Sequence, residues 1–204
     1  MSFDFIFKIA ILGDTGVGKS SIVNKFARNT FNLTPGPTIG VEFDSKIIKN
    51  NGSKYKLQIW DMSGNKAYLN LIQMYLKSVA YVLLVYDISN KESFLNIKNW
   101  YNIIKKKIPH NAGIMIVCNK TDLCKKCTNT FSFVADEQLK HLSEELSIPY
   151  TKTTCNKTNS VDNLFRTLLD NIHKKGILPR TSYKKYTPIT VTRPTKRCSN
   201  CSIM

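Results

Sequence analysis

The sequence has no long hydrophobic run, few cysteines and few acidic residues, and each shortage excludes a class of protein. Its longest unbroken apolar run, residues 79–86, has eight residues, whereas a membrane-spanning helix needs about 20. The six cysteines are too scattered over 204 residues to form a disulfide scaffold. The first four residues include an acid and no basic residue, so we expect no secretory signal. These shortages favour a soluble intracellular protein.

Charge is strongly unbalanced, because 30 basic residues face only 14 acids and give a net charge of +16. Residues 178–204 hold six of the basic residues, no acid and no apolar periodicity, which is typical of a flexible linker. We therefore expect a folded domain over residues 1–177 and a flexible basic tail over residues 178–204. The excess charge fits a solvated surface, an anionic membrane or nucleic acid. No cluster of base-reading or stacking groups accompanies it, so nucleic acid is not expected as a partner.

Short apolar strands alternate with amphipathic helices along the expected domain. Strands are expected at residues 5–12, 41–48, 54–60, 81–86, 113–118 and 150–153. Helices are expected around residues 22–26 and at 68–76, 92–108, 136–146 and 161–174. The turn Asn50-Asn51-Gly52 indicates a hairpin, so the second and third strands should be antiparallel. The pattern predicts a three-layer α/β fold, with a mainly parallel six-stranded sheet, one antiparallel strand and helices on both faces.

A glycine-rich segment between the first strand and the first helix matches the phosphate-loop pattern in full, since residues 13–20 read GDTGVGKS. Such glycines let backbone N–H groups surround phosphate oxygens at a helix start, where the helix dipole favours anions. Lys19 is expected to reach the outer phosphates, and the Ser20 hydroxyl to ligate Mg²⁺. A chance match is the alternative, but the flanking strand and helix supply the required context. The expected phosphate-binding residues are Thr15, Gly16, Val17, Gly18, Lys19, Ser20 and Ser21.

A second motif, Asn119-Lys120-Thr121-Asp122, follows the expected strand at residues 113–118. The Asp122 carboxylate can accept hydrogen bonds from both N1–H and the exocyclic amine of guanine, whereas adenine offers an acceptor at N1 and no amine at C2. A mismatch of this kind supports discrimination of about 10⁴-fold. In isolation these residues would more often form a surface turn; after a phosphate loop, we interpret Asn119, Lys120 and Asp122 as guanine-binding. This argues against an ATPase or nucleotide kinase, in which ATP would compete with GTP.

Two further segments are candidates for binding the metal and the terminal phosphate. Asp61 follows the expected strand at residues 54–60 and can hold Mg²⁺ through water, while Gly64 lets the backbone approach the γ-phosphate. Thr38 follows a segment rich in proline and glycine and is the candidate second hydroxyl ligand. We therefore expect GTP or GDP as the ligand, with Mg²⁺ held by Ser20, Thr38 and Asp61.

Taken in order, these motifs resemble those of small GTPases, and more narrowly of the Rab family, over about residues 5–175. Further stretches that carry the resemblance are PTIGVEF at 37–43, KLQIWD at 56–61, LVYDISN at 84–90 and Asn99-Trp100. The resemblance implies a GTP/GDP switch in vesicle traffic that recruits effectors in the GTP state. It also implies exchange factors, activating proteins and a lipid-shielding escort as partners. A monomer at the cytoplasmic face of an endomembrane, with a cytosolic pool, is expected.

The resemblance also assigns roles that residue type alone leaves open. Phe31 stands where the family stacks an aromatic ring on guanine, with core packing as the alternative. Thr154 and Cys155 belong to the segment whose backbone N–H contacts the guanine oxygen, and Asn156 replaces the family's lysine there. The resemblance also implies an effector surface, whose aromatic residues would be interpreted from composition alone as ordinary half-buried side chains. That surface comprises Ile39, Gly40, Phe43, Trp60 and Tyr75.

One departure from the family pattern affects catalysis. The family's DTAGQE reads DMSGNK at residues 61–66, so Asn65 stands where small GTPases use glutamine to orient the attacking water. Its side chain is one methylene shorter, and a displacement near 1 Å can lower the rate ~100-fold. With Lys19 and Asn65 as the catalytic residues, we expect slow intrinsic GTP hydrolysis. The alternative is a nucleotide-locked scaffold that does not hydrolyse GTP.

Two cysteine pairs remain. Cys124 and Cys127 have the spacing of half a zinc site, but no matching second pair follows, so an exposed surface loop is the interpretation. Cys201 is fourth from the end of the sequence, the prenylation spacing, and Cys198 is a candidate second lipid site. One lipid chain binds membranes only marginally, and each tail basic residue adds about 1 kcal/mol near an anionic surface. We expect lipidation of both, with incidental cysteines in a disordered basic end as the alternative.

Overall fold

The computed structural model describes residues 2–31, 36–125, 133–177 and 179. Its strands are β1 (Phe5–Leu12), β2 (Val41–Asn50), β3 (Ser53–Met62), β4 (Tyr81–Asp87), β5 (Gly113–Asn119) and β6 (Tyr150–Lys152). Its α-helices are α1 (Lys19–Arg28), α2 (Leu69–Leu76), α3 (Lys91–Lys105), α4 (Asp136–Leu146) and α5 (Thr158–Lys174). Two short 3₁₀ helices, η1 (Lys66–Tyr68) and η2 (Leu123–Lys125), follow β3 and β5.

The strands form one six-stranded sheet in the order β2-β3-β1-β4-β5-β6. β2 and β3 pair antiparallel, and every other neighbouring pair is parallel, which confirms the predicted sheet. In the hairpin, Asn50 pairs with Ser53, and the two turn residues Asn51 and Gly52 have positive φ values of 46° and 79°. Positive φ at both central residues is what a two-residue turn matched to the strand twist requires.

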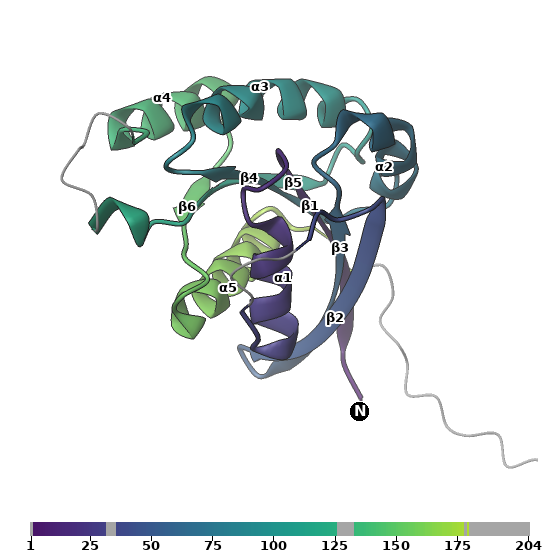
Figure 1. Ribbon diagram of the computed structural model, residues 1–204. Coiled ribbons are helices and arrows are strands. Elements are labelled where there is room, and N and C mark those ends of the chain that lie inside the picture. The colour runs from purple at the N-terminus through teal and green to yellow at the C-terminus, as the bar shows by residue number, and fades with distance from the viewer. Residues whose placement is uncertain (1, 32–35, 126–132, 178, 180–204) are drawn as a thin grey trace, which may run out of the picture.

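Helices cover both faces of the sheet, as Figure 1 shows with α1 and α5 on one side and α2, α3 and α4 on the other. Alternate residues of each central strand enter the two cores: Ile9 packs with α1 and α5, whereas Ala10 packs with α2, α3 and α4. β4 and β5 are buried along their whole length, which explains their unbroken apolar sequences. The three-layer prediction is confirmed.

Several element ends differ from the prediction by a few residues. The helix expected over residues 92–108 ends at Lys105, and the N–H groups of Lys107 and Ile108 turn back to the carbonyl of Ile104. The reason is Pro109, which disfavours helical geometry at the residue before it. α5 begins at Thr158 rather than residue 161, and β6 ends at Lys152 rather than residue 153.

The chain leaves α5 through a tight reversal. Gly176 has a φ of 61°, its N–H donates to the His173 carbonyl, and the N–H of Ile177 donates to the Ile172 carbonyl. This is a glycine-based helix stop, and it returns the buried Ile177 side chain to the core shared with α1 and α5. Residues 180–204 of the expected tail lie outside the described residues. Among the described residues, no helix combines the length and apolarity needed to cross a membrane.

Candidate nucleotide-binding site

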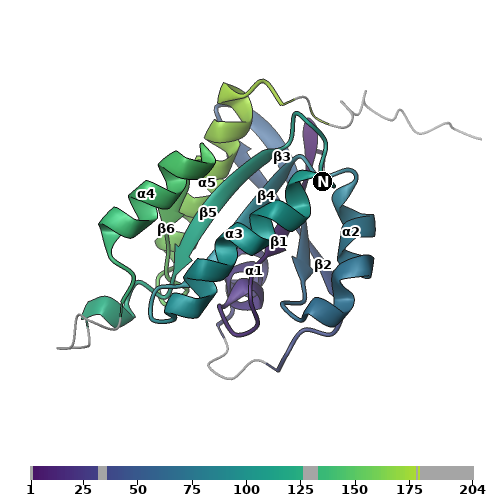
Figure 2. The ribbon, with the colours of Figure 1, turned by 90° about the horizontal axis from the view of Figure 1, so that it is seen from above.

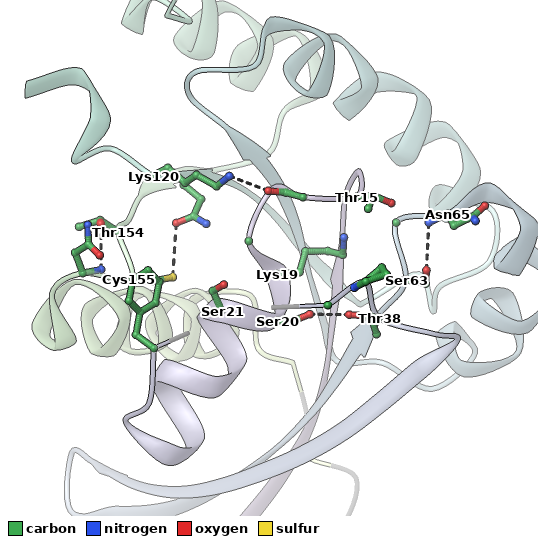
Figure 3. A pocket seen from close by; sticks show the side chains of 18 of the residues that line it. Thr15, Lys19, Ser20, Ser21, Thr38, Ser63, Asn65, Lys120, Thr154 and Cys155 are labelled. Carbon is green, nitrogen blue, oxygen red and sulfur yellow. Dashed lines mark hydrogen bonds between the residues drawn. The ribbon is translucent and has the colours of Figure 1, made fainter. Parts of the chain in front are cut away.

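Five loops meet around a cavity of about 940 Å³ at the edge where the parallel strands end, within the usual size range of ligand sites. They are the segments after β1, before β2, after β3, after β5 and after β6. Figure 3 shows side chains from these segments facing one space. The sequence-predicted residues that line it are Thr15, Gly16, Gly18, Lys19, Ser20, Ser21, Phe31, Thr38, Ile39, Gly64, Asn65, Asn119, Lys120, Asp122, Thr154, Cys155 and Asn156.

Two predicted residues do not line the cavity. Val17 is buried, and its carbonyl oxygen accepts a 2.8 Å hydrogen bond from the Asn119 side chain. Asp61 is also buried, below Ser20. Sequence reasoning did not name other lining residues, which are Gly36, Pro37, Ser63, Tyr68 and Leu123. Of these, Ser63 could have been found from its place between Asp61 and Gly64.

The phosphate loop has the backbone that its glycines predict, with φ values of 82° at Gly16 and 93° at Gly18. The Lys19 ammonium donates to the carbonyl oxygens of Gly13 and Asp14 at 2.9 and 2.7 Å. Burial lowers the pKa of Lys19 to about 8, although the carboxylates of Asp61 and Asp14 act in the opposite direction. An anion in the cavity would favour the charged form of this lysine.

Asp14 ties the phosphate loop to α3, which sequence reasoning missed. One carboxylate oxygen accepts a 2.7 Å hydrogen bond from the Trp100 indole N–H, and the other accepts one of 2.7 Å from the Asn96 amide. The only signal was the Asn99-Trp100 pair, which carried part of the family resemblance. The contact fixes the loop relative to a helix that begins at the same edge of the sheet.

Three oxygen-bearing side chains lie together beside Lys19. The Ser20 and Thr38 hydroxyls are 2.7 Å apart, and the Asp61 carboxylate is 2% exposed with one oxygen that has no hydrogen-bond partner. Burial raises the pKa of Asp61 to about 6, against the lowering effects of a Ser20 hydrogen bond and of Lys19. Among the described residues, no cluster of three His, Cys, Asp or Glu side chains forms a metal site. Two hydroxyls and an unsatisfied carboxylate oxygen fit a hard cation such as Mg²⁺.

The loop after β5 is bound to the phosphate loop by two side chains. Asn119 is 1% exposed and donates to the Val17 carbonyl oxygen. The Lys120 ammonium donates to the Gly16 carbonyl oxygen at 2.8 Å and forms a 2.8 Å ion pair with Asp87. The base end and the phosphate end of the cavity are therefore one connected structure.

Two residues of the loop after β6 hold the Asp122 carboxylate in place. One of its carboxylate oxygens accepts a hydrogen bond from the Thr154 hydroxyl and the other accepts one from the Asn156 amide. The Cys155 side chain is buried, with its sulfur 3.9 Å from the Asn119 amide oxygen. The Asn156 contact was not anticipated, because the resemblance places a lysine at this position.

Phe31 is 39% exposed and lines the cavity, which argues against the alternative of core packing. At the opposite end, the loop after β3 lies directly on the phosphate loop. A Cβ atom at Gly64 would stand 2.2 Å from the backbone nitrogen of Thr15, so only glycine fits there. The Asn65 amide oxygen accepts the N–H of Ala67 at 2.9 Å and thereby caps η1.

Three residues of the implied effector surface, Phe43, Trp60 and Tyr75, pack against one another, and a fourth, Ile39, lines the cavity. Trp60 contacts both Phe43 and Tyr75, with ring centroids 5.0 and 4.7 Å apart. Phe43 is 49% exposed and Ile39 is 77% exposed, whereas Gly40 is buried and its carbonyl oxygen accepts the Ser63 N–H at 2.9 Å. Exposed apolar side chains gathered in this way are typical of interaction sites.

The structure describes one of the four cysteines in the two cysteine pairs of the sequence. Cys124 is exposed in η2, in keeping with the surface interpretation. Cys127, Cys198 and Cys201 lie outside the described residues.

A strand, glycine loop and helix joined at one cavity to an Asn-Lys-x-Asp loop are the arrangement typical of phosphate-loop nucleotide-binding proteins. The sequence profile of the Ras family matches residues 8–174. Ras-related protein RABA2b of Arabidopsis thaliana is 35% identical over 171 residues, which cover 84% of this chain and 78% of the relative. Ras-related protein SEC4 of Saccharomyces cerevisiae is 33% identical over 174 residues, covering 85% and 78%. Ras-related protein RIC1 of rice is 32% identical over 203 residues, covering 98% and 97%.

The chain therefore belongs to the Ras family of small GTPases, in its Rab group. Members of the Ras family bind guanine nucleotide and hydrolyse GTP.

Proposed function

We propose that this chain is a GTP/GDP-cycling switch that regulates vesicle traffic by recruiting effector proteins while GTP is bound. The observation that carries the proposal is the single cavity in which Lys19, Thr38 and Asp122 come together from three separate loops. A cavity of this volume and lining can accommodate phosphates at the glycine loop and a purine at Asp122. The relatives' names, which call them Ras-related, support the same assignment.

Different residues of the cavity bind different parts of the nucleotide. Lys19 and the backbone N–H groups of the glycine loop bind the phosphates, Phe31 stacks on the base, and Asp122 accepts the guanine N1–H and amine. Ser20, Thr38 and Asp61 would hold Mg²⁺, which supplies charge neutralisation at the phosphates. The backbones of Thr154, Cys155 and Asn156 close the base end of the cavity.

Switching follows from the positions of Thr38 and Gly64. Each lies in a loop that borders the cavity and continues into the patch of Ile39, Phe43 and Trp60. Contacts of these loops with the γ-phosphate and metal order them, and hydrolysis releases them. Effectors that bind the ordered patch would then distinguish the GTP state from the GDP state.

Intrinsic hydrolysis is slow in this proposal, because the Asn65 amide is short and caps η1. Most of the catalysis then comes from positioning and from the Lys19 charge. The second candidate function is a nucleotide-locked scaffold, which the engaged Asn65 side chain favours. Single-turnover hydrolysis with and without an activating protein separates the two, since a scaffold shows no turnover in either case.

The proposal also assigns the tail a role as a membrane anchor. Lipids on Cys201 and Cys198, together with six basic residues in residues 178–204, would anchor the monomer to the cytoplasmic face of an endomembrane, and an escort would maintain a cytosolic pool. Exchange and activating proteins would drive the cycle. We expect Cys201→Ser to move the protein from membranes to cytosol in a fractionation experiment. Unchanged membrane association of that variant would contradict the lipid anchor.

Nucleotide competition tests the main proposal. GTP and GDP should displace a fluorescent GDP from purified protein, and ATP should not do so at 1,000-fold higher concentration, on the order of the discrimination a buried mismatch gives. Asp122→Ala should lose this preference, whereas Asp170→Ala, which removes an exposed carboxylate on α5, should keep it. Equal displacement by ATP and GTP would overturn the assignment.

A further inference from the structure

The edge of the sheet opposite the cavity is built from the ends of several elements. In a sheet of this kind the connecting helices run back along the strands, so their C-terminal ends lie where the strands begin. The β2–β3 turn lies at the same edge, because β3 begins there. In Figure 2 the N-terminus and the C-terminal ends of α3 and α5 lie in the upper half of the view, and α1, next to the phosphate loop, lies in the lower half.

Lysines are concentrated at this edge, which we name the lysine edge. Its members come from the β2–β3 hairpin and from the segments that end α2, α3 and α5. They are Lys49, Lys54, Lys56, Lys77, Lys105, Lys106, Lys107, Lys174 and Lys175. All but Lys54 and Lys56 are exposed. Within the described part of the chain, none of them forms an ion pair, so their charge is not locally compensated.

Few carboxylates lie near this edge, and all but one of them already accept a hydrogen bond or form an ion pair. Asp4 accepts the backbone N–H of Lys54 at 2.7 Å. Glu144 and Glu145, at the end of α4, form ion pairs with Lys140 and Lys98. Asp170 lies on α5 one turn before Lys174. The lysine edge therefore keeps a strong positive potential, which attracts anionic partners over about 8 Å at physiological salt.

The lysine edge is polar as well as basic. The exposed large apolar side chains of the described residues are Phe31, Ile39, Phe43, Leu71, Met74, Leu95 and Tyr150. Of these, Met74 lies in the last turn of α2, three residues before Lys77, and Tyr150 begins β6. Proteins that bind single-stranded nucleic acid place exposed aromatic rings among their basic residues. Here the rings of Phe3 and Tyr101, which lie beside Lys56 and Lys105, are only partly exposed. Its chemistry fits a layer of lipid headgroups better than stacked bases.

The path of the chain supports the same partner. α5 ends at Lys174, and the buried Ile177 fixes the chain at this edge, so the tail with Cys198 and Cys201 begins beside the lysines. The exposed patch of Ile39 and Phe43 lies at the cavity end of the molecule. A membrane that faced the lysine edge would leave that patch accessible to effectors.

We propose that the lysine edge is a membrane-contact surface for anionic lipid headgroups, which acts with the tail and orients the cavity away from the bilayer. The inference rests on the proposed function for the anchoring role of the tail. Each basic residue close to an anionic bilayer strengthens binding about fivefold, so a few of these lysines have a measurable effect without any lipid anchor.

Vesicle sedimentation of the full-length, unlipidated, GDP-loaded chain tests this surface. The probes are vesicles of phosphatidylcholine alone and vesicles with about one third phosphatidylserine, at 0.1 M salt. The variant K105Q/K106Q/K107Q neutralises three exposed lysines of the edge. The control K66Q/K157Q/R166Q removes the same charge from exposed residues in η1, directly before α5 and in α5, away from the edge. GDP affinity, measured on the same samples, reports folding and the nucleotide site separately.

The edge variant should bind phosphatidylserine vesicles at least tenfold more weakly than the wild type, the control less than threefold more weakly, and all three should bind GDP equally. An equal loss of vesicle binding in the two variants would contradict the proposed membrane-contact surface, because the total charge of the protein would then explain binding. So would preferential, edge-dependent binding of an RNA duplex over the vesicles. Failed GDP binding by the wild type would contradict the proposed function instead, whatever the vesicle result.

Discussion

Asn65 differs from the expected glutamine by one methylene, and the structure shows where its amide goes. The side-chain oxygen caps η1 through the Ala67 N–H, and the Asn65 N–H itself donates to the Ser63 hydroxyl at 3.3 Å. The residue therefore stabilises the loop after β3 rather than extending toward the phosphates. A longer side chain would give the amide the reach that water orientation needs.

Asn65→Gln should accelerate intrinsic GTP hydrolysis by about tenfold or more, within the ~100-fold range for a displacement near 1 Å. Single-turnover hydrolysis of preloaded GTP measures the effect. Asn65→Ala is the control, since it also removes the cap but supplies no amide. Equal rates for the glutamine variant and the wild type, or equal acceleration in both variants, would contradict the catalytic role.

Asn156 joins the loop after β6 to the loop after β5, because its amide donates to Asp122. A hydrogen bond to a charged group contributes about 1.5–3 kcal/mol when buried, and less here because Asn156 is exposed. We expect Asn156→Ala to release GDP roughly fivefold faster, a change of about 1 kcal/mol, and still to exclude ATP. Stopped-flow release of a fluorescent GDP measures this. Asn159→Ala, which changes an exposed residue in the first turn of α5, should match the wild type. Similar rates in both variants would contradict the role of Asn156.

How far each residue could be predicted depends on how local its contacts are. The phosphate loop was predicted in full because residues 13–20 are consecutive and their glycine spacing dictates the backbone. Asp122 and Asn156 are 34 positions apart, and Asp14 and Trp100 are 86 apart. Nothing in the local pattern of either pair encodes such a contact, so only the fold could reveal them.

At the scale of elements, α3 positions the phosphate loop. Asp14 receives hydrogen bonds from Trp100 and Asn96, on adjacent turns of this helix. The loop is also held from β4, because a Cβ atom at Gly13 would stand 2.1 Å from the Val85 carbonyl oxygen. The phosphate loop is thus held in place from two sides.

Trp100→Phe keeps the buried ring but removes the N–H donor to Asp14. We expect the free energy of unfolding to fall by about 1–2 kcal/mol, since a hydrogen bond to a carboxylate is lost, and GDP affinity to fall severalfold. Urea denaturation and GDP titration measure the two effects. Tyr101→Phe, which removes a hydroxyl from the next residue, is the control. A Trp100 variant no more impaired than this control would contradict the account of α3.

The loop after β3 packs on the phosphate loop through Gly64. Gly64→Ala should displace this loop, because the new Cβ atom would overlap the Thr15 nitrogen. We expect at least tenfold slower single-turnover hydrolysis, with GDP binding changed less than threefold. Gly36→Ala is the matched control, since Gly36 also lines the cavity and has open space around it. Normal hydrolysis by the Gly64 variant would mean that the loop is not placed by this contact.

The elements themselves were largely predictable from periodicity. β4 and β5 read as continuous apolar runs because both of their faces are covered, and the Asn51-Gly52 turn fixed the antiparallel pair. The ends were less predictable, because α5 starts three residues early and no polar side chain caps it. Such ends depend on tertiary contacts rather than on local propensity.

At the scale of the whole molecule, the two surfaces for which a function is proposed lie at opposite edges of the sheet. The strand ends at one edge carry the cavity and the patch of Ile39, Phe43 and Trp60, and the strand starts at the other edge carry the lysine edge and the exit of α5. Composition alone showed the excess charge but not its location. The location emerged only when the topology placed the ends of three helices and one hairpin together.

The central claim is that separate loops around one cavity bind one guanine nucleotide at the same time. Hydrogen exchange of the full-length protein measures this directly at four of the five loops. Adding GDP and Mg²⁺ should slow exchange together at residues 15–20, 61–65, 119–122 and 154–156, while ADP should protect none of them. Bound nucleotide suppresses local opening wherever it makes contact. Joint protection by GDP alone supports the account; protection confined to residues 15–20, or equal protection by ADP, would contradict it.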